Sequence, residues 1–309
     1  MTIPPIESFP LLDGTSIPWL AWGNGTGGAR RNAVECGHLA LAGGVRHIDT
    51  AQLYENERET GEAIRLAGLK REDVYVTSKI SCTENDTPLP LSAVPASIQA
   101  SLDRLGSIPD LYLIHNPFVA RPGELKALWH VLEDFKEQGK LKSIGVSNFR
   151  PQDLEEILEG ARYTPVVNQI EYHPYTLAHL QPLLDLHARH GIVTASYGTL
   201  TPLLRHPSGG GPLAPILQRI ASRLSDALGK QVEKSTVLML WARARGVVVV
   251  TASGNAERVK KLGEIASLPP GLLTEKEVEE ITRVGRGVHF RYYTEHMEKD
   301  FPVPDLPRE

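Results

Sequence analysis

The 309-residue chain is 41% hydrophobic and 23% charged, which supplies apolar material for a large core and argues against intrinsic disorder. Its formal net charge of −4, without a basic stripe, argues against a nucleic-acid partner. The two cysteines, Cys36 and Cys82, are too few for a disulfide framework or a structural zinc site. We therefore expect a reducing compartment and no metal.

The N-terminal segment MTIPPIESFPLLDG has neither a basic start nor a long apolar run, so we do not expect a secretory signal. No apolar stretch approaches the roughly 18 residues that a membrane span needs. We expect a soluble, cytoplasmic protein without a membrane partner. We also expect one domain over residues 1–309 that is a monomer or a weak homodimer.

A hairpin between Phe9 and Ile17 opens the pattern, with Asp13-Gly14 as its turn. It precedes the regular alternation of strands and helices, so we expect it to cover the floor of a barrel. Eight β-rich runs follow: Trp19–Trp22, Val45–Ile48, Val74–Thr77, Leu111–Ile114, Ser143–Val146, Val166–Asn168, Ile192–Ala195 and Val247–Val250.

Amphipathic stretches alternate with these runs and predict helices over Asn32–Ala42, Glu57–Leu66, Ser92–Leu105, Glu124–Gln138, Pro151–Leu158, Leu177–His190, Ser235–Arg245 and Ala256–Ile265. This alternation favours parallel strands with right-handed crossovers. Eight units fit a closed (β/α)8 TIM barrel, an α/β fold, better than an open sheet. Two segments break the rhythm and are predicted as loops, Gly198–Pro215 and the tail Gly285–Glu309.

The run from Gly23 to Gly28 matches the G-x-G-x-x-G fingerprint of a Rossmann fold, and Asp49 follows at a plausible distance. We reject this interpretation because the other polar candidates are spread over the ends of many strands, as in a barrel. The glycines would still let the backbone approach a ring closely.

Four polar residues lie at or just after the ends of three consecutive predicted strands: Asp49, Tyr54, Lys79 and His115. In a parallel barrel these ends converge on the rim where active sites form. Each residue has an ordinary alternative. Asp49 suits a helix cap or turn, Tyr54 surface packing, and His115 a hydrogen-bonded rim position. Lys79 is harder to explain in this way, because an ammonium between apolar strand residues must reach water or an acid.

The motifs around these residues resemble those of the aldo-keto reductases, in order and over essentially the whole chain. Their details are closest to fungal-type reductases of keto esters, diketones and conjugated polyketones. The motifs are Asp49-Thr50-Ala51-x-x-Tyr54-x-Asn56-Glu57, Ser78-Lys79, Leu113-Ile114-His115-x-Pro117, Ile144-Gly145-Val146-Ser147-Asn148-Phe149 and Asn168-Gln169-Ile170-Glu171-Tyr172-His173-Pro174.

The resemblance implies a catalytic tetrad of Asp49, Tyr54, Lys79 and His115, with Tyr54 protonating the oxygen of a small-molecule carbonyl substrate. An ammonium about 4 Å away is worth roughly 4 kcal/mol, or about 3 pKa units. Lys79 is therefore expected to bring the pKa of Tyr54 close to neutrality. Asp49 would keep Lys79 charged, and a neutral His115 would donate a hydrogen bond to the substrate oxygen.

The resemblance also implies NADP(H) extended across the rim. Tyr197 would stack on the nicotinamide, with Ser147, Asn148 and Gln169 at its carboxamide. Gly23 and Asn24, with Asp49, would line the ribose. The remaining cofactor candidates, which lie after the seventh and eighth strands, are Gly198, Leu200, Thr251, Ser253, Gly254, Asn255 and Arg258.

Within that last group, Ser253 and Asn255 can cap a helix whose N–H groups face an anion, and Arg258 can grip a 2′-phosphate. The chain departs from the common family pattern here. It has Ala252 where many members have lysine, and Lys261-Leu262 where a Glu-Asn pair is usual. Lys260 or Lys261 can compensate for the lost charge. We expect NADPH as cofactor, with NADH as the alternative.

The predicted substrate contacts are Trp22, Tyr54, His115, Asn116 and Phe118. Asn116 replaces an aromatic residue common in the family, so we expect a polar wall suited to polar or dicarbonyl substrates. Three other functions stay open on the same scaffold. They are oxidation of an alcohol or sugar with NAD(P)+, reduction of an imine or enone, and a cofactor-binding regulatory subunit.

Overall fold

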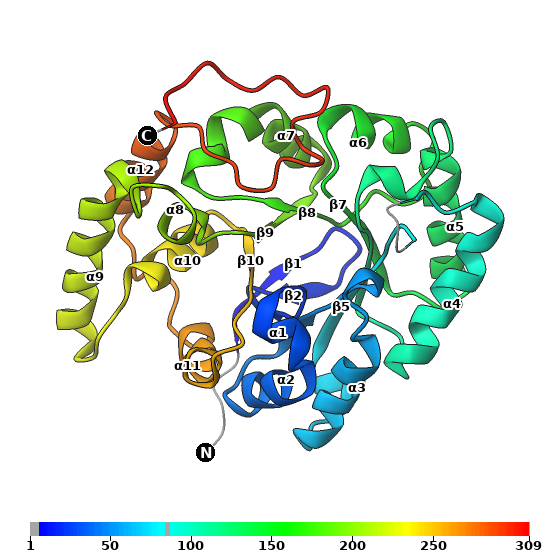
Figure 1. Cartoon of the computed structure of the whole chain (residues 1–309), viewed down its shortest axis with the longest axis horizontal. Coiled ribbons are helices and arrows are strands. Elements are labelled where there is room, and N and C mark those ends of the chain that lie inside the picture. Colours follow the sequence, from blue (N-terminus) through cyan, green and yellow to red (C-terminus); the bar gives the residue numbers. More distant parts are fainter. Residues whose placement is uncertain (1–5, 84–86, 309) are drawn as a thin grey trace.

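The computed structural model describes residues 6–83 and 87–308, so part of the N-terminal segment interpreted above lies outside the described residues. Eight parallel strands close into a barrel in the order β10-β3-β4-β5-β6-β7-β8-β9, surrounded by helices (Figure 1). This confirms the predicted (β/α)8 fold. The barrel strands are β3 (Leu20–Gly23), β4 (His47–Asp49), β5 (Tyr75–Ile80), β6 (Leu111–Ile114), β7 (Ser143–Ser147), β8 (Val167–Glu171), β9 (Val193–Tyr197) and β10 (Val248–Thr251).

The strands run further toward the rim than the sequence indicated. β5 continues through Lys79 to Ile80, and β8 continues through Gln169 to Glu171. In a sequence, polar residues at the end of a strand resemble a loop. Here they belong to the strands and pair in register with the neighbouring strands. Lys79 pairs with Leu113 and Asp49 pairs with Thr77. Candidate side chains are thus fixed by the sheet itself.

The predicted hairpin is present as β1 (Ser8–Pro10) and β2 (Ser16–Pro18). Phe9 and Ile17 pack on an apolar cluster that includes Leu111, Val167 and Val248, which are the first residues of their strands. The hairpin therefore closes the amino-terminal end of the barrel, as expected. The larger core cluster lies between the strands and the surrounding helices.

The helices are α1 (Gly27–Arg31), α2 (Ala33–Ala42), α3 (Glu57–Leu66), α4 (Val94–Leu105), α5 (Leu125–Glu137), α6 (Pro151–Leu158), α7 (Leu177–His190), α8 (Thr201–Leu204), α9 (Ala214–Leu228), α10 (Lys234–Ala244), α11 (Ala256–Ala266) and α12 (Glu275–Gly285). Single turns of 3-10 helix are η1 (Gln52–Tyr54), η2 (Arg71–Asp73), η3 (Leu91–Ala93), η4 (Pro117–Val119), η5 (Pro174–Thr176) and η6 (Gly211–Leu213).

Two parts of the sequence interpretation need correction. Gly198–Pro215 is not one loop, since it contains α8 and η6 and runs into α9. Neither α9 nor α12 was predicted, because the expected alternation of one helix per strand left their amphipathic patterns unassigned. Both pack beside α10 at the edge of the barrel (Figure 1).

The C-terminal tail after α12 crosses the carboxyl-terminal side of the barrel near α6 and α7 (Figure 1). Gln152 donates to the Asp300 carbonyl at 2.9 Å, and His179 bonds the Phe301 carbonyl at 3.1 Å. Buried Glu171 accepts from the backbone N–H of Tyr292 and of Tyr293, at 3.1 Å each. In residues 6–83 and 87–308, no helix is both long and apolar enough to cross a membrane.

Candidate active site

Three neighbouring strands bring the predicted tetrad together. Asp49 ends β4, Lys79 lies near the end of β5, and His115 directly follows β6. Buried Lys79 donates from Nζ to Asp49 Oδ1 at 2.5 Å and to the Thr50 carbonyl at 2.9 Å. An isolated buried ammonium would be very unfavourable, and this pairing compensates its lost hydration.

Gln169 holds the Asp49 carboxylate from across the barrel. Its Nε2 atom, on β8, donates to Asp49 Oδ2 at 2.7 Å. Both carboxylate oxygens therefore accept a hydrogen bond, one from Lys79 and one from Gln169. The pair is fixed in orientation before any ligand enters.

Tyr54 is placed by the short η1 turn that follows β4. Glu55 ends this turn in the left-handed region at φ 58°, and Arg30 donates to the Tyr54 carbonyl at 3.0 Å. The Tyr54 ring packs on Gly25, where an added Cβ would lie 2.6 Å from the ring Cζ. A side chain at position 25 would displace the Tyr54 ring, so the glycine run does let the backbone approach a ring.

The half-buried Tyr54 ring lies between Lys79 and His115. Lys79 Nζ is 5.1 Å from the ring centre, and the Tyr54 hydroxyl is 3.4 Å from His115 Nε2. The two rings meet edge to face at 5.5 Å and 82°. A phenol, an imidazole and an ammonium thus share one polar corner of the rim.

The electrostatics of this corner correct one expectation. Burial raises the pKa of Tyr54, and the nearby negative charge of Asp49 raises it further. Lys79 does not bring it toward neutrality, because Asp49 compensates the ammonium charge at 2.5 Å. Burial also lowers the pKa of Lys79, while Asp49 opposes that shift. Burial and the positive charge of Lys79 hold the pKa of His115 well below its usual range, so the imidazole is neutral as expected.

The side chains predicted to hold a nicotinamide carboxamide contact one another. Asn148, in the left-handed region at φ 59°, donates to the His115 carbonyl at 3.0 Å. The Tyr197 hydroxyl donates to Asn148 Oδ1 at 2.6 Å. Ser147 donates to the Gln169 carbonyl at 2.8 Å. These residues, in or directly after β7, β8 and β9, therefore form one hydrogen-bonded group beside the tetrad, which Gln169 joins through its backbone carbonyl.

Gly23 and Asn24, the residues predicted to line a ribose, lie beside Asp49. Gly23 pairs with Asp49 in the sheet, and Asn24 N donates to the Asp49 carbonyl at 3.0 Å. Asn24 Nδ2 is bound to Thr60, but its buried Oδ1 has no partner within the described residues. The Asn24 side chain is therefore enclosed between β3 and α3, and only its backbone lies next to Asp49.

The segment Thr251–Arg258 connects β10 to α11 at another part of the rim. Asn255 caps α11 by accepting from Arg258 N at 3.0 Å, and Ser253 Oγ accepts from Asn255 N at 3.2 Å. Gly254 lies against Gly28, where an added Cβ would be 2.5 Å from the Gly28 backbone. The glycine run thus serves a close chain contact in a closed barrel, and the rejection of a Rossmann fold is confirmed.

Comparison with known proteins gives a consistent result. Residues 20–285 match the model of the Aldo/keto reductase family. The chain is 33% identical to the NAD/NADP-dependent indole-3-acetaldehyde reductase of Schizosaccharomyces pombe, over 93% of this chain and 98% of that protein. It is 33% identical to the prostaglandin-E(2) 9-reductase of Oryctolagus cuniculus, over 98% of both chains.

A crystal structure of an aldo/keto reductase from Brucella melitensis superposes with a TM-score of 0.74 at 31% identity, covering 91% of this chain and all of that one. The chain belongs to the aldo/keto reductase family. As a member of this family it is an oxidoreductase that uses a nicotinamide cofactor to reduce aldehydes or ketones.

Not every residue predicted to contact the substrate lies at the rim of this reductase. Trp22 is fully buried, packs near Gly37 of α2, and donates from Nε1 to the Ser253 carbonyl at 3.1 Å. Alternate residues of a strand point to opposite sides, and these contacts place the Trp22 side chain on the side that faces the helices. Trp22 therefore belongs to the core and not to a substrate pocket.

The other pocket candidates adjoin the tetrad and the tail. Asn116 Oδ1 caps η4 by accepting from Phe118 N at 2.9 Å. The Phe118 ring lies 5.7 Å from the ring of His296 and 5.1 Å from Lys299 Nζ, both in the tail. Leu200 and Gly198 follow β9 and are half-buried. Gly198 has a φ of 66° and lies near the ring of Tyr293.

Sequence reasoning missed Ser81, whose Oγ lies 2.8 Å from His115 Nδ1. It also missed Asn56, which donates to the Asn24 carbonyl at 2.9 Å. Ser81 could have been found from the period of two along a strand, because it follows Lys79 by two residues and points to the same side. Asn56 carried no comparable signal beyond its place in the motif after Tyr54.

Proposed function

We propose that this reductase converts an aldehyde or ketone to an alcohol with NADPH, and that Tyr54 donates the proton. The observation that carries the proposal is the corner where the Tyr54 hydroxyl, neutral His115 and the Lys79–Asp49 pair meet. Two donors beside one point suit an oxygen that gains negative charge.

The roles follow from the contacts. When bound, the nicotinamide supplies a hydride to the carbonyl carbon. The carbonyl oxygen then becomes basic and takes the proton of Tyr54, which leaves a phenolate beside the Lys79 ammonium. Asp49 keeps Lys79 charged and in place. His115 donates to the same substrate oxygen and orients it.

The raised pKa of Tyr54 is compatible with this role. A phenol that keeps its proton throughout the neutral range is always ready to donate, and the transfer becomes favourable only as the substrate oxygen becomes negative. The nearby ammonium then stabilises the phenolate, so Lys79 acts on the product of proton transfer rather than on the resting phenol.

The residues present fit a nicotinamide dinucleotide. Gly23 and Asn24, next to Asp49, would border the ribose. The group of Ser147, Asn148, Gln169 and Tyr197 offers amide and hydroxyl groups to a carboxamide, with the Tyr197 ring as its stacking surface. Leu200 and Gly198 would border the same groove.

The choice of NADPH rests on the N-terminus of α11 and on exposed Arg258. First-turn N–H groups of a helix attract anions, and an arginine can bind a phosphate through two hydrogen bonds. Lys261 is paired with Glu233 at 3.4 Å, so exposed Arg258 and Lys260 are the cations assigned to this contact. A lower KM for NADH than for NADPH would overturn this choice.

The substrate class is inferred from the residues that directly follow His115. Asn116 and Phe118, beside the tail, would give a mixed polar and aromatic wall, which suits keto esters or diketones. The named relatives reduce indole-3-acetaldehyde and a prostaglandin, so this scaffold accepts varied carbonyls. A panel of aldehydes, keto esters, diketones and sugars, followed by NADPH absorbance, identifies the class.

The Tyr54→Phe variant tests the mechanism. Loss of a general acid lowers turnover by about 100-fold or more, while the retained ring keeps the packing on Gly25 and NADPH binding. Single-turnover kinetics and NADPH fluorescence titration measure the two properties. Tyr75→Phe is the matched control, because it removes a phenol hydroxyl at the opposite end of β5. Loss of NADPH binding in Tyr54→Phe would show that Tyr54 is structural.

A further inference from the structure

Ser81 is a buried hydroxyl that joins two catalytic elements. It follows β5 directly, and its Oγ lies 2.8 Å from His115 Nδ1. The same Oγ accepts from Leu53 N, in η1, at 3.3 Å. Leu53 immediately precedes Tyr54, so one side chain touches both the histidine and the turn that carries the tyrosine.

The hydrogen-bond partners of Ser81 favour one position for the proton of His115. A serine hydroxyl has one proton, and within the described residues Oγ contacts only Leu53 N and His115 Nδ1. Leu53 N is a donor, so Nδ1 is the one acceptor that these two contacts offer to the Ser81 proton. A neutral imidazole that accepts at Nδ1 carries its proton at Nε2.

This tautomer sets the direction of proton donation at the active site. Nε2 is the ring atom that lies 3.4 Å from the Tyr54 hydroxyl. With a proton on Nε2, His115 donates toward Tyr54 and the substrate oxygen, and the Tyr54 proton is free for transfer. In the other tautomer, Nε2 would accept the Tyr54 proton and draw it away from the substrate.

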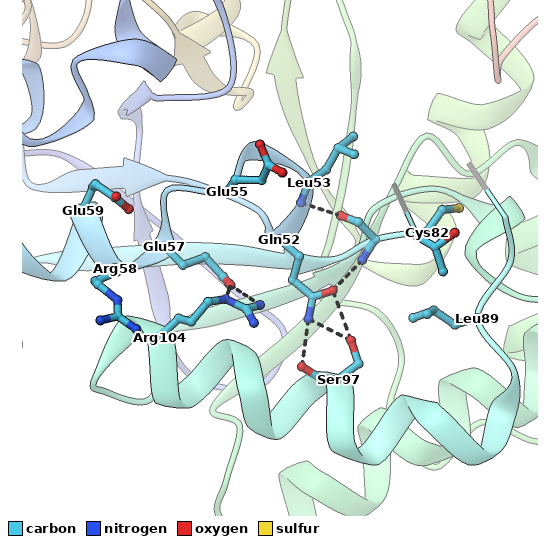
Figure 2. Close-up of a pocket in the computed structure, with 12 residues that line it drawn as sticks. Gln52, Leu53, Glu55, Glu57, Arg58, Glu59, Cys82, Leu89, Ser97 and Arg104 are labelled. Atoms are coloured by element: carbon cyan, nitrogen blue, oxygen red, sulfur yellow. Dashed lines mark hydrogen bonds and ion pairs between the residues drawn. The ribbon is translucent and has the colours of Figure 1, made fainter. Parts of the chain in front are cut away.

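Further hydrogen bonds hold η1 on the side that faces a cleft. A cleft of about 710 Å3 opens behind the turn and is bordered by Gln52, Leu53 and Ser97 (Figure 2). Ser81 N donates to Gln52 Oε1 at 3.1 Å, and Gln52 Nε2 donates to the Ser97 carbonyl at 2.9 Å. Ser81 therefore holds two residues of η1, once through its backbone and once through its hydroxyl.

We propose that Ser81 is a positioning residue that holds His115 in the Nε2–H tautomer and fixes the turn that presents Tyr54. The inference rests on the proposed function for its catalytic consequence, but the tautomer is a property of the ligand-free protein. It can therefore be measured without turnover.

The first measurement is the 15N NMR spectrum of the His115 ring in the ligand-free protein, assigned by comparison with His115→Gln. The expected spectrum of the unmodified protein shows a protonated Nε2 and an unprotonated Nδ1. Ser81→Ala should move both ring shifts toward an average of the two tautomers, and Ser81→Thr should restore them. A protonated Nδ1 in the unmodified protein, or unchanged shifts in Ser81→Ala, would refute the inference.

The second measurement is kcat with a good carbonyl substrate. Losing one aligned donor lowers the rate by about tenfold or more, so Ser81→Ala should fall by that factor and Ser81→Thr should recover most of it. Ser97→Ala is the matched control, because Ser97 also supports Gln52 but does not touch His115. An equal loss of kcat in Ser97→Ala would reduce Ser81 to a general support of η1. If Tyr54→Phe keeps full turnover, the proposed function fails while the tautomer measurement stands.

Discussion

Two regions of the rim differ in how much of their hydrogen bonding exists before a ligand binds. At the β4–β6 corner, Asp49 and Lys79 are buried and bonded to each other, and buried Gln169 of β8 donates to the same Asp49 carboxylate. At the start of α11, Arg258 is exposed, and no other described residue bonds its guanidinium. In the first region the fold fixes the polar side chains before a ligand binds. In the second region it fixes the capped helix start but not the Arg258 side chain.

This difference matches the two tasks. Charge that develops within a reaction is stabilised most by groups that do not have to reorient, so the corner must be rigid. A phosphate already carries its charge in water and can be gripped by a flexible cation. Changes in the corner should therefore affect stability and the chemical step together, while changes at α11 should affect only cofactor affinity.

The largest effect is expected from Lys79→Met. Breaking a buried ion pair costs about 3–5 kcal/mol, because the remaining charge on Asp49 is unpaired. Removal of the ammonium should also lower the single-turnover rate by about 100-fold or more. The Lys79→Met/Asp49→Asn double variant should regain most of the lost melting temperature but none of the activity. Calorimetry and rapid-mixing kinetics measure both, and a stable, active single variant would contradict the comparison.

An intermediate effect is expected from Arg258→Ala. A hydrogen bond to a charged group is worth about 1.5–3 kcal/mol, which corresponds to a roughly 10- to 100-fold loss of NADPH affinity. Affinity for NADH, the melting temperature and the rate at saturating cofactor should stay unchanged. Lys260→Ala is the neighbouring control and should have a smaller effect. Equal weakening of both cofactors would show that Arg258 does not recognise the 2′-phosphate.

The same contrast explains what the sequence could predict. The proximity of Asp49, Lys79 and His115 could be predicted because these polar residues lie at or next to the ends of β4, β5 and β6, and parallel pairing brings consecutive strand ends together. The hairpin and all eight barrel strands were found for a similar reason, since local turn and strand patterns specify them. In each case the decisive information lay within a few residues of the chain.

The features that sequence reasoning got wrong depend on distant contacts. The direction of the Tyr54 pKa shift depends on Asp49 neutralising Lys79, which no spacing specifies. Trp22 looked like a pocket residue, but the side of the strand it occupies is set by its packing against α2. Helices α9 and α12 lie outside the repeating strand–helix unit, so the regular alternation did not predict them.

The smallest expected effect is a difference in pH dependence between the two regions. Burial lowers the pKa of His115 and raises that of Tyr54, so the histidine stays neutral at pH 5.5 and the phenol stays protonated at pH 8. The single-turnover rate at saturating NADPH should therefore change by less than about twofold across this range.

The affinity for NADPH should depend on pH, because its 2′-phosphate titrates. Phosphate monoesters lose their second negative charge below a pKa of about 6, so NADPH affinity should fall severalfold at pH 5.5.

NADH affinity supplies the control for that prediction, because it lacks the titrating phosphate and should be constant. The melting temperature must be followed at each pH as well. Burial lowers the pKa of His179 and of His289 to about 4. These side chains favour the folded state above pH 6.5, and that contribution is lost as the pH falls toward 4. If the rate at saturating NADPH fell with pH while the melting temperature held, His115 would be titrating and the corner would be less enclosed than its geometry indicates.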